Sequence, residues 1–269
     1  MTTINEKKMD FAEGRVSAML TGSHITVRYG GTAVVNDLSF RLDAGQWLML
    51  VGPNGAGKTT LIEAIAQGVP YTGTFQWEGE DLRHIKTAQL AQRIGVLSQN
   101  NAVSYAYTVG EVVELGRYAR RRGFLSGRDE EGMERIDRAL RMTGLWELRH
   151  ASVLRLSGGE LQRAFLAQVF AQDPRVLILD EPANHLDLQY QQQIFSLIGR
   201  WLEQPGRAVL SVVHDLSLAR RYGTHAVLMH HGVSAAQGPV GEVLTPEHLR
   251  AVYEMDVHGW MREMLALWE

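Results

Sequence analysis

The chain of 269 residues contains no cysteine, no long apolar run and no excess of basic charge. Without cysteine, disulfide scaffolds, thiolate zinc sites, iron–sulfur clusters and cysteine nucleophiles are excluded. No apolar stretch approaches the roughly 18 residues that a membrane-spanning helix needs. The formal net charge is −3, from 27 basic and 30 acidic residues, so no global positive field attracts nucleic acid. We expect neither a membrane span nor a nucleic-acid partner.

The residues that are present have the balance of an ordinary globular protein. Hydrophobic residues make up 45% and charged residues 21% of the chain, which excludes a disordered, collagen-like or coiled-coil protein. The opening residues Met1–Asp10 lack the apolar stretch of a secretory signal, so we expect a cytoplasmic location. Lysine is scarce: the 27 basic residues include only Lys7, Lys8, Lys58 and Lys86.

Five segments have the patterns of β-strands. Alternation over Ser23–Tyr29, a glycine turn and the segment Ala33–Leu42 predict two antiparallel strands near the N-terminus. The nearly unbroken apolar runs Gln46–Val51, Val176–Leu179 and Ala208–Val213 are typical of parallel strands that are covered on both faces. The sequence therefore predicts an α/β core with a mixed sheet and an antiparallel N-terminal sheet.

A helical segment interrupts this core at about residues 100–165. Thr108 and Glu111 have the spacing of a capping box ahead of an apolar helix face. A charged helix is predicted over Arg128–Met142, and Gly144 is a candidate cap for its C-terminal end. We expect an inserted helical subdomain.

The segment after the Gln46–Val51 strand has the spacing of a phosphate-binding loop, Gly-x-x-x-x-Gly-Lys-Thr, and a helix pattern follows it. Glycines let the backbone N–H groups surround a phosphate at a helix N-terminus, the lysine reaches the β- and γ-phosphates, and the threonine hydroxyl ligates Mg²⁺. The predicted ATP-binding residues are Gly52, Pro53, Asn54, Gly55, Ala56, Gly57, Lys58, Thr59 and Thr60.

Two adjacent carboxylates, Asp180 and Glu181, follow the Val176–Leu179 strand. Ligands bind at the carboxyl edge of a parallel sheet, so this pair is predicted to lie beside the phosphates. Asp180 suits the Mg²⁺ shell, and Glu181 is placed to polarise the water that attacks the γ-phosphate.

A second glycine-containing segment, Ser157-Gly158-Gly159-Glu160, precedes another helix pattern. Ser157 and Glu160 have capping-box spacing, which by itself indicates only a well-capped helix. The two glycines expose backbone N–H groups at the helix N-terminus and predict a second anion-binding end. One nucleotide needs two such ends only if they face it from opposite sides.

These motifs together resemble the nucleotide-binding subunit of an ABC transporter, with a match from about residue 22 to residue 258. The family signature corresponds to Leu156–Glu160, and the acidic strand end corresponds to Asp180 and Glu181. The resemblance identifies Gln99 with the Q-loop glutamine, the segment Asn184-His-Leu-Asp187 with the D-loop and His214 with the switch histidine.

The resemblance implies functional roles for these residues. Tyr29 would stack on adenine, Gln99 would sense Mg²⁺ and connect to the membrane partner, and His214 would contact the γ-phosphate. It also implies that two copies close head to tail, with each ATP between the phosphate loop of one copy and Ser157, Gly158, Gly159 and Glu160 of the other. The implied sites are catalytic (Lys58, Glu181, His214), ATP-binding (the loop residues, Tyr29, Gln99, residues 157–160 and Asp187) and Mg²⁺-binding (Thr59, Gln99, Asp180).

Three positions depart from the family pattern. Glu160 stands where glutamine is commoner, Ala183 stands where threonine or serine is usual, and His185 occupies a variable D-loop position. None of these removes a phosphate or metal ligand, so the resemblance implies an active ATPase.

The tail Gly238–Tyr253 and the segment Tyr107–Arg117 resemble importer cassettes for iron–siderophore, haem and cobalamin uptake. The implied partners are a polytopic membrane permease and, indirectly, a substrate-binding protein, at the cytoplasmic face of the inner membrane. The alternative is a soluble, non-transport ATPase that acts as a regulatory or assembly module. The implied domain is 22–258, with core 22–99 and 166–258, helical subdomain 100–165, extension 1–21 and tail 259–269.

Overall fold

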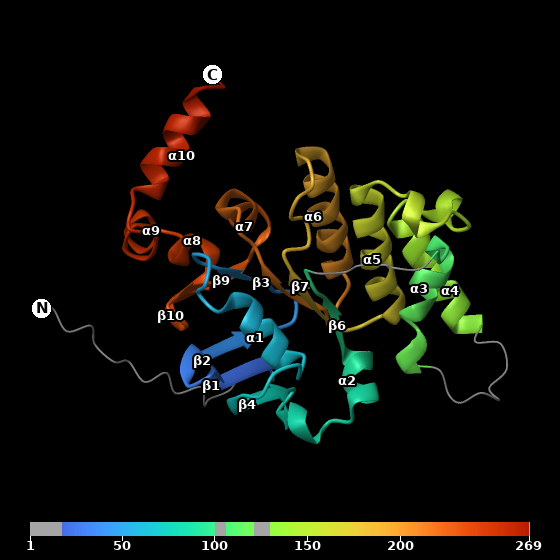
Figure 1. Ribbon diagram of the computed structural model, residues 1–269, viewed down its shortest axis with the longest axis horizontal. Coiled ribbons are helices and arrows are strands. Elements are labelled where there is room, and N and C mark those ends of the chain that lie inside the picture. Colours follow the sequence, from blue (N-terminus) through green and yellow to red (C-terminus); the bar gives the residue numbers. More distant parts are fainter. Residues whose placement is uncertain (1–17, 100–105, 121–129, 269) are drawn as a thin grey trace, which may run out of the picture.

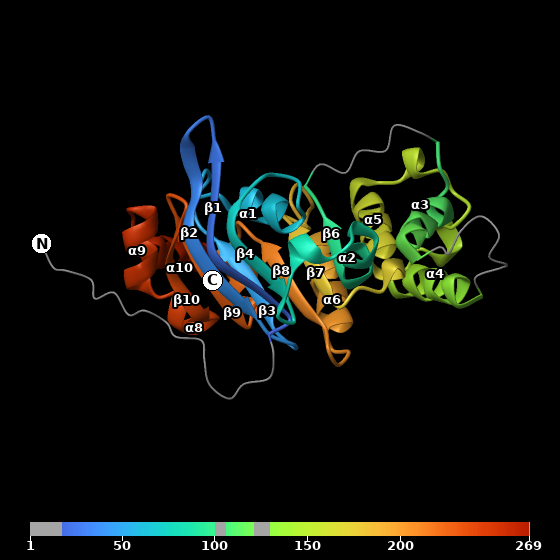
Figure 2. The same cartoon turned by 90° about the horizontal axis from the view of Figure 1, so that it is seen from below.

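The structure, a computed structural model, describes residues 18–99, 106–120 and 130–268. Most of the predicted N-terminal extension and parts of the predicted helical subdomain, including Arg121 and Arg122, lie outside these ranges. The chain forms two sheets and a helical part that lies beside the larger sheet (Figures 1 and 2).

The main sheet has six strands in the order β10-β9-β3-β8-β7-β6. Five are parallel, and β10 pairs with β9 in the antiparallel sense, which confirms the predicted mixed sheet. The three predicted apolar runs are its central strands. The bounds are β3 (Trp47–Val51), β6 (Ile94–Leu97), β7 (Val176–Asp180), β8 (Ala208–Val212), β9 (His225–His230) and β10 (Val233–Pro239).

The N-terminal sheet is antiparallel, as predicted, with the order β2-β1-β4-β5. Its first strand begins at Leu20, so the expected boundary between residues 21 and 22 falls inside that strand. The bounds are β1 (Leu20–Tyr29), β2 (Thr32–Leu42), β4 (Thr72–Trp77) and β5 (Glu80–Asp81), and the short helix η1 (Leu82–His84) follows.

Both faces of the main sheet are buried, which explains why its strands lack alternation. On β3, Trp47, Met49 and Val51 pack into a core with the helices of one face. Leu48 and Leu50 pack on the other face against α1 (Lys58–Ile65) and the N-terminal sheet. Helix α1 is thereby held between the two sheets, and its N-terminus is fixed at the edge where β3 ends (Figure 1).

The helical part contains α3 and α4 packed against α5. Helix α3 begins with the predicted capping box of Thr108 and Glu111. Helix α5 runs without a break into the core, so the expected boundary at residues 165–166 falls within it. The bounds are α3 (Val109–Leu115), η2 (Tyr118–Arg120), α4 (Glu130–Met142), η3 (Trp146–Leu148), η4 (Val153–Arg155) and α5 (Gly158–Gln172).

The remaining helices connect and flank the main sheet. In both ribbon views, the helical part lies at the opposite end of the molecule from α9 and α10 (Figures 1 and 2). The bounds are α2 (Thr87–Arg93), α6 (Leu188–Leu202), α7 (Leu216–Tyr222), α8 (Val240–Val243), α9 (Pro246–Tyr253) and α10 (Val257–Ala266).

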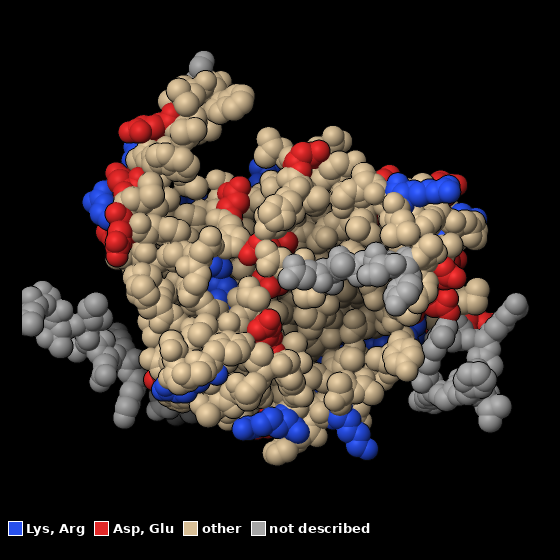
Figure 3. Space-filling view, viewed as in Figure 1, with Lys and Arg blue, Asp and Glu red and all other residues tan. Residues whose placement is uncertain are grey.

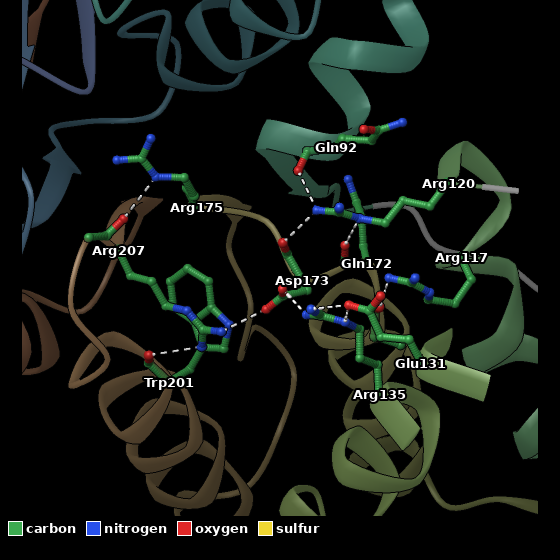
Figure 4. Close-up of polar contacts among 12 residues, drawn as sticks. Gln92, Arg117, Arg120, Glu131, Arg135, Gln172, Asp173, Arg175, Trp201 and Arg207 are labelled. Carbon is green, nitrogen blue, oxygen red and sulfur yellow. Dashed lines mark hydrogen bonds and ion pairs between the residues drawn. The ribbon is translucent and has the colours of Figure 1, made fainter. Parts of the chain in front are cut away.

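Asp173, at the C-terminal end of α5, joins the helical part to the core (Figure 4). Its carboxylate pairs with Arg135 of α4 and, at 2.8 Å, with Arg207 just before β8. Arg120 donates to the carbonyls of Gln172 and Asp173 at 3.0 and 3.1 Å. Burial and the neighbouring Arg135 lower the pKa of Arg207 to about 10, so this joint is crowded with positive charge.

On the face shown in Figure 3, acidic and basic side chains lie in small mixed groups between large uncharged areas. The helices in the described part of the chain include none with the length and apolar character required to cross a bilayer.

Candidate active site

Four neighbouring strands of the main sheet, β3, β8, β7 and β6, end at the same edge because they are parallel. The phosphate loop begins at Gly52 after β3, and His214 follows β8 by two residues. Glu181 follows β7 directly, and Gln99 follows β6 by two residues. Residues that are far apart in the sequence therefore meet at the carboxyl edge, where α/β sheets bind ligands.

The phosphate loop depends on glycine at Gly52 and Gly57 for two reasons. Both have positive φ, at 143° and 94°, which side-chain-bearing residues rarely adopt. A Cβ on Gly52 would collide with the Met229 carbonyl of β9, and one on Gly57 would collide with the Val34 carbonyl of β2. Both ends of the loop thus lie against the sheets, whereas its tip at Asn54 and Gly55 is exposed, which leaves the backbone there free to approach an anion closely.

Lys58 is folded into this loop and is only 5% exposed. Its ammonium donates to the carbonyls of Gly52 at 2.7 Å and Pro53 at 2.8 Å. Burial lowers the pKa of Lys58, while the carboxylates of Glu181 and Asp180 act in the opposite direction. The chain thus supplies one enclosed ammonium, next to backbone donors, at a helix N-terminus, which is the chemistry that a phosphate chain requires.

Asp180 and Thr59 present oxygen atoms to each other across the site. The Thr59 hydroxyl donates to Asp180 Oδ1 at 3.3 Å, and Asp180 is 3% exposed. Burial raises the pKa of Asp180, and the hydrogen bond from Thr59 partly offsets this effect. A hydroxyl and one carboxylate form the small, hard donor set with which proteins hold Mg²⁺ when phosphates supply further ligands, so these residues fit that ion.

Three side chains converge on the carboxylate of Glu181. Gln99 Nε2 donates to its Oε2 at 2.9 Å, and Asn184 Nδ2 donates to the same oxygen. His214 Nε2 pairs with Oε1. Glu181 itself has a left-handed backbone with φ 51°, a conformation that costs energy and is concentrated at functional sites. This arrangement orients a carboxylate beside the phosphate loop.

The segment Ser157–Glu160 forms the predicted capping box at the start of α5. The backbone N–H of Ser157 donates to Glu160 Oε2 at 2.8 Å, which lowers the pKa of Glu160. A Cβ on Gly159 would collide with the Tyr190 ring of α6, whereas one on Gly158 would meet no atom within 4 Å. Packing against Tyr190 therefore explains why residue 159 is glycine, whereas no described contact within the chain requires glycine at position 158.

Two other predicted ATP-binding residues have local roles. Asp187 caps α6, because its Oδ1 accepts a hydrogen bond from the backbone N–H of Tyr190 at 3.0 Å. The residue Tyr29 is 47% exposed, and its hydroxyl donates to Glu63 of α1 at 3.3 Å. Tyr29 thus lies over the helix that follows the phosphate loop, with a ring face available to a ligand.

The structure therefore divides the predicted site residues into two groups. Lys58, Thr59, Asp180 and Glu181 are brought together with Gln99 and His214 at the carboxyl edge. Within the described ranges, no hydrogen bond or ion pair connects Ser157, Glu160 or Asp187 with that group or with the loop.

Sequence reasoning did not assign a site role to Asn184, Glu63 or Tyr190. Asn184 lies three residues after Glu181 in a turn, a spacing that could have indicated the contact. Glu63 lies one helical turn after Thr59, on the helix that the loop begins. The contact of Tyr190 with Gly159 joins two helices that are remote in sequence, so no local signal predicted it.

A glycine-rich phosphate loop before α1, beside a strand that ends in two carboxylates, defines a P-loop nucleotide-binding protein. The profile of the ABC transporter family matches residues 35–184. The chain is 35% identical over 237 residues to ferric enterobactin transport ATP-binding protein FepC of Escherichia coli, covering 88% of this chain and 87% of FepC. It is 37% identical over 243 residues to hemin import ATP-binding protein HmuV of Jannaschia sp., covering 87% of each.

Two further comparisons concern length and fold. The chain is 36% identical over 230 residues to the uncharacterized ABC transporter ATP-binding protein YvrA of Bacillus subtilis, which covers 85% of this chain but 52% of YvrA. A solved inward-facing metal-chelate type ABC transporter, described as putative, has a chain that superposes with a TM-score of 0.77 at 23% identity, covering 89% and 90% of the two chains. The chain belongs to the ABC transporter family. Within such a transporter it is the subunit that binds and hydrolyses ATP.

Proposed function

We propose that this chain energises an ABC importer for a metal chelate of the iron–siderophore, haem or cobalamin class. The transport names of FepC and HmuV support the cargo class. The observation that carries the catalytic part is the carboxylate of Glu181, oriented by Gln99, Asn184 and His214 beside the enclosed Lys58.

ATP binding uses groups that the chain already holds at the edge of the main sheet. Backbone N–H groups of the phosphate loop surround the β-phosphate, and Lys58 exchanges its loop carbonyls for phosphate oxygens. The exposed face of Tyr29 stacks on adenine. Thr59, Asp180 and Gln99 are the residues that would hold Mg²⁺, which neutralises charge on the phosphates when bound.

Hydrolysis depends on Glu181 and His214. The Glu181 carboxylate accepts a hydrogen bond from the attacking water and so orients its lone pair toward the γ-phosphorus. His214, now paired with Glu181 Oε1, donates to an oxygen of the γ-phosphate. Because phosphoryl transfer requires little covalent chemistry from the protein, the acceleration comes mainly from positioning and from preorganised charge.

A second copy completes the site. Ser157 and Gly158 are exposed, and the described contacts of their segment lead to α6 rather than to the phosphate loop of the same chain. Two copies placed head to tail direct Ser157, Gly159 and the N-terminus of α5 of one copy at the ATP held by the other. ATP binding closes this dimer, and hydrolysis reopens it.

Glu181→Gln tests the composite site. The amide keeps the shape of the side chain but is a far weaker base, so ATP affinity is retained, turnover falls at least about 100-fold and the closed dimer accumulates. Gel filtration with and without ATP, together with phosphate release, measures both effects. A Glu181→Gln protein that stays monomeric with saturating ATP, or that hydrolyses ATP at the wild-type rate, contradicts the proposal.

The membrane partner is proposed to bind the outer side of α3. Tyr107, Leu115 and Tyr118 are exposed there and line a hollow of about 210 Å³ together with Glu111. Exposed aromatic residues around a hollow are typical of protein interfaces. A polytopic permease bound here would hold the chain at the cytoplasmic face of the inner membrane, with a substrate-binding protein on the far side.

Affinity purification of the tagged chain from detergent-solubilised membranes separates transport from the alternative, a soluble regulatory or assembly ATPase. We expect a polytopic membrane protein to co-purify, and Tyr118→Glu to reduce its yield at least about tenfold. Leu265→Glu, at another exposed apolar position on α10, is the control and should retain the partner. Purification of the chain without any membrane protein would favour the alternative.

A further inference from the structure

A basic hollow of about 490 Å³ lies between α4, α5 and α6, away from the edge where the nucleotide residues meet. Arg141 and Gly144 line it from the end of α4, Arg163 from α5 and Arg200 from α6. The other polar groups that line it are neutral, and no acidic side chain is among its described lining residues: these are Thr143, Gln192, Gln193 and Ser196.

The three arginines of this hollow form no ion pair with a carboxylate among the described residues. Arg163 donates from Nη1 to Gln193 Oε1 at 2.7 Å, but its Nε is buried with no acceptor among them. Arg141 stacks over Trp146 at 3.9 Å, and Arg200 is exposed. Guanidinium groups stay charged in proteins, so three positive charges line one hollow. Glu160 interacts with Arg163 from the preceding turn of α5, but it does not line the hollow.

The arginines of the hollow differ in this respect from those at the joint around Asp173. There, Arg120, Arg135 and Arg207 are satisfied by the carboxylate of Asp173 and by carbonyls at the end of α5 (Figure 4). At the hollow, by contrast, Arg141 and Arg200 form no ion pair among the described residues, so an acceptor for their guanidinium groups must come from outside the chain.

We infer that the hollow binds a small anion that carries two or more phosphate groups. The planar fork of arginine matches phosphate oxygens in a bidentate manner, and three forks around one space suit a ligand with several such oxygens. The amides of Gln192 and Gln193 and the hydroxyl of Ser196 add neutral donors. Either a free polyphosphate compound or a phospholipid headgroup with two phosphates, as in cardiolipin, carries this chemistry.

The hollow is connected to the start of α5 through one aromatic ring. The Arg163 guanidinium lies 5.6 Å from the centroid of the Tyr190 ring, and that ring packs where a Cβ of Gly159 would be. The backbone of Tyr190 is also bonded to Asp187. An anion that engages Arg163 therefore acts on Gly159 and Asp187. An effect of the bound anion on ATP hydrolysis rests on the proposed function, whereas binding of the anion in the hollow does not.

Titration with inorganic pyrophosphate tests the binding. Because the phosphate loop binds this probe as well, calorimetry is performed on Lys58→Ala, which disables the loop. We expect one pyrophosphate per chain to remain bound, and Arg141→Gln with Arg200→Gln in the same background to weaken it at least tenfold. Arg83→Gln, an exposed arginine on η1, is the matched control and should leave the affinity unchanged.

Two further measurements complete this binding test: a second protein variant and a vesicle assay. If Lys58→Ala does not fold, the same titration is performed on Glu181→Gln with its phosphate loop filled by ATP. Sedimentation with vesicles that contain cardiolipin, whose headgroup has two phosphates, distinguishes a lipid headgroup from a free ligand, and loss in the double arginine variant supports the site in either case. The inference is overturned if neither pyrophosphate nor vesicles bind, or if the hollow variants and the Arg83→Gln control behave alike.

Discussion

The two glycine-containing helix starts of this chain, at α1 and at α5, have similar local chemistry but opposite surroundings. At α1, the glycines lie against carbonyls of both sheets, and the following lysine is 5% exposed. At α5, Ser157 and Gly158 are exposed, and the capping box satisfies the first donors from within the segment. One start is enclosed by its own chain, and the other is turned outward.

This difference is what an ATP site divided between two copies of the chain would require. Glu181, Asp180 and Gln99 approach the α1 start from neighbouring strands, so one chain supplies the loop, the proposed Mg²⁺ ligands and the carboxylate that we propose orients water. The α5 start contributes rigid donors and is held in place by α6. We propose that it serves the partner's nucleotide.

The largest effect is expected at the enclosed start. Lys58→Ala removes the only ammonium within the described phosphate loop, so ATP affinity should fall at least about 100-fold, as for a buried charge-assisted contact. Titration with a fluorescent ATP analogue measures it. Lys86→Ala, an exposed lysine beside α2, is the control and should bind normally. Unchanged affinity in Lys58→Ala would contradict the assignment of the loop.

The division of the site predicts complementation between two inactive variants. Ser157→Arg blocks the outward start but leaves the loop intact, whereas Lys58→Ala does the reverse. Each should be inactive alone. In an equimolar mixture, half of the dimers combine both variants and hold one intact site, so about a quarter of the wild-type rate should return if sites act independently.

Phosphate release from the mixture, compared with each variant alone, measures this recovery. Mixing Ser157→Arg with Ser157→Arg, Lys58→Ala is the control, because that pair contains no intact combination. Absence of recovery in the first mixture, with dimers verified by gel filtration, would show that both helix starts act within one chain.

Smaller effects are expected from alanine substitutions at the two glycines of the outward start, and they should differ between Gly158 and Gly159. Gly159→Ala places a Cβ against the Tyr190 ring and should reduce the free energy of unfolding by about 1–3 kcal/mol, as overpacking does. Gly158→Ala meets no atom and should leave stability nearly unchanged, while slowing hydrolysis if the segment faces ATP. Urea unfolding and phosphate release measure the two effects. Equal destabilisation by both substitutions would contradict the packing at Gly159.

Local patterns predicted much of this fold. Three apolar runs became β3, β7 and β8, and the spacing of Thr108 with Glu111 and of Ser157 with Glu160 became two observed capping boxes. These succeed because burial on both faces and helix capping are decided within a few residues. The continuity of α5 through residue 172 was not predicted, since its apolar face serves both the helical part and the core.

The sequence alone determined the chemistry of this protein: the phosphate loop, the carboxylate pair and the order of motifs that place it among ABC transporter ATPases. Tertiary structure decided what each group meets. The association of Glu181 with Asn184 and His214, the packing of Tyr190 on Gly159 and the gathering of three arginines in one hollow each join distant segments. Spacing along a chain specifies local geometry, but only the packing of strands and helices brings such segments together.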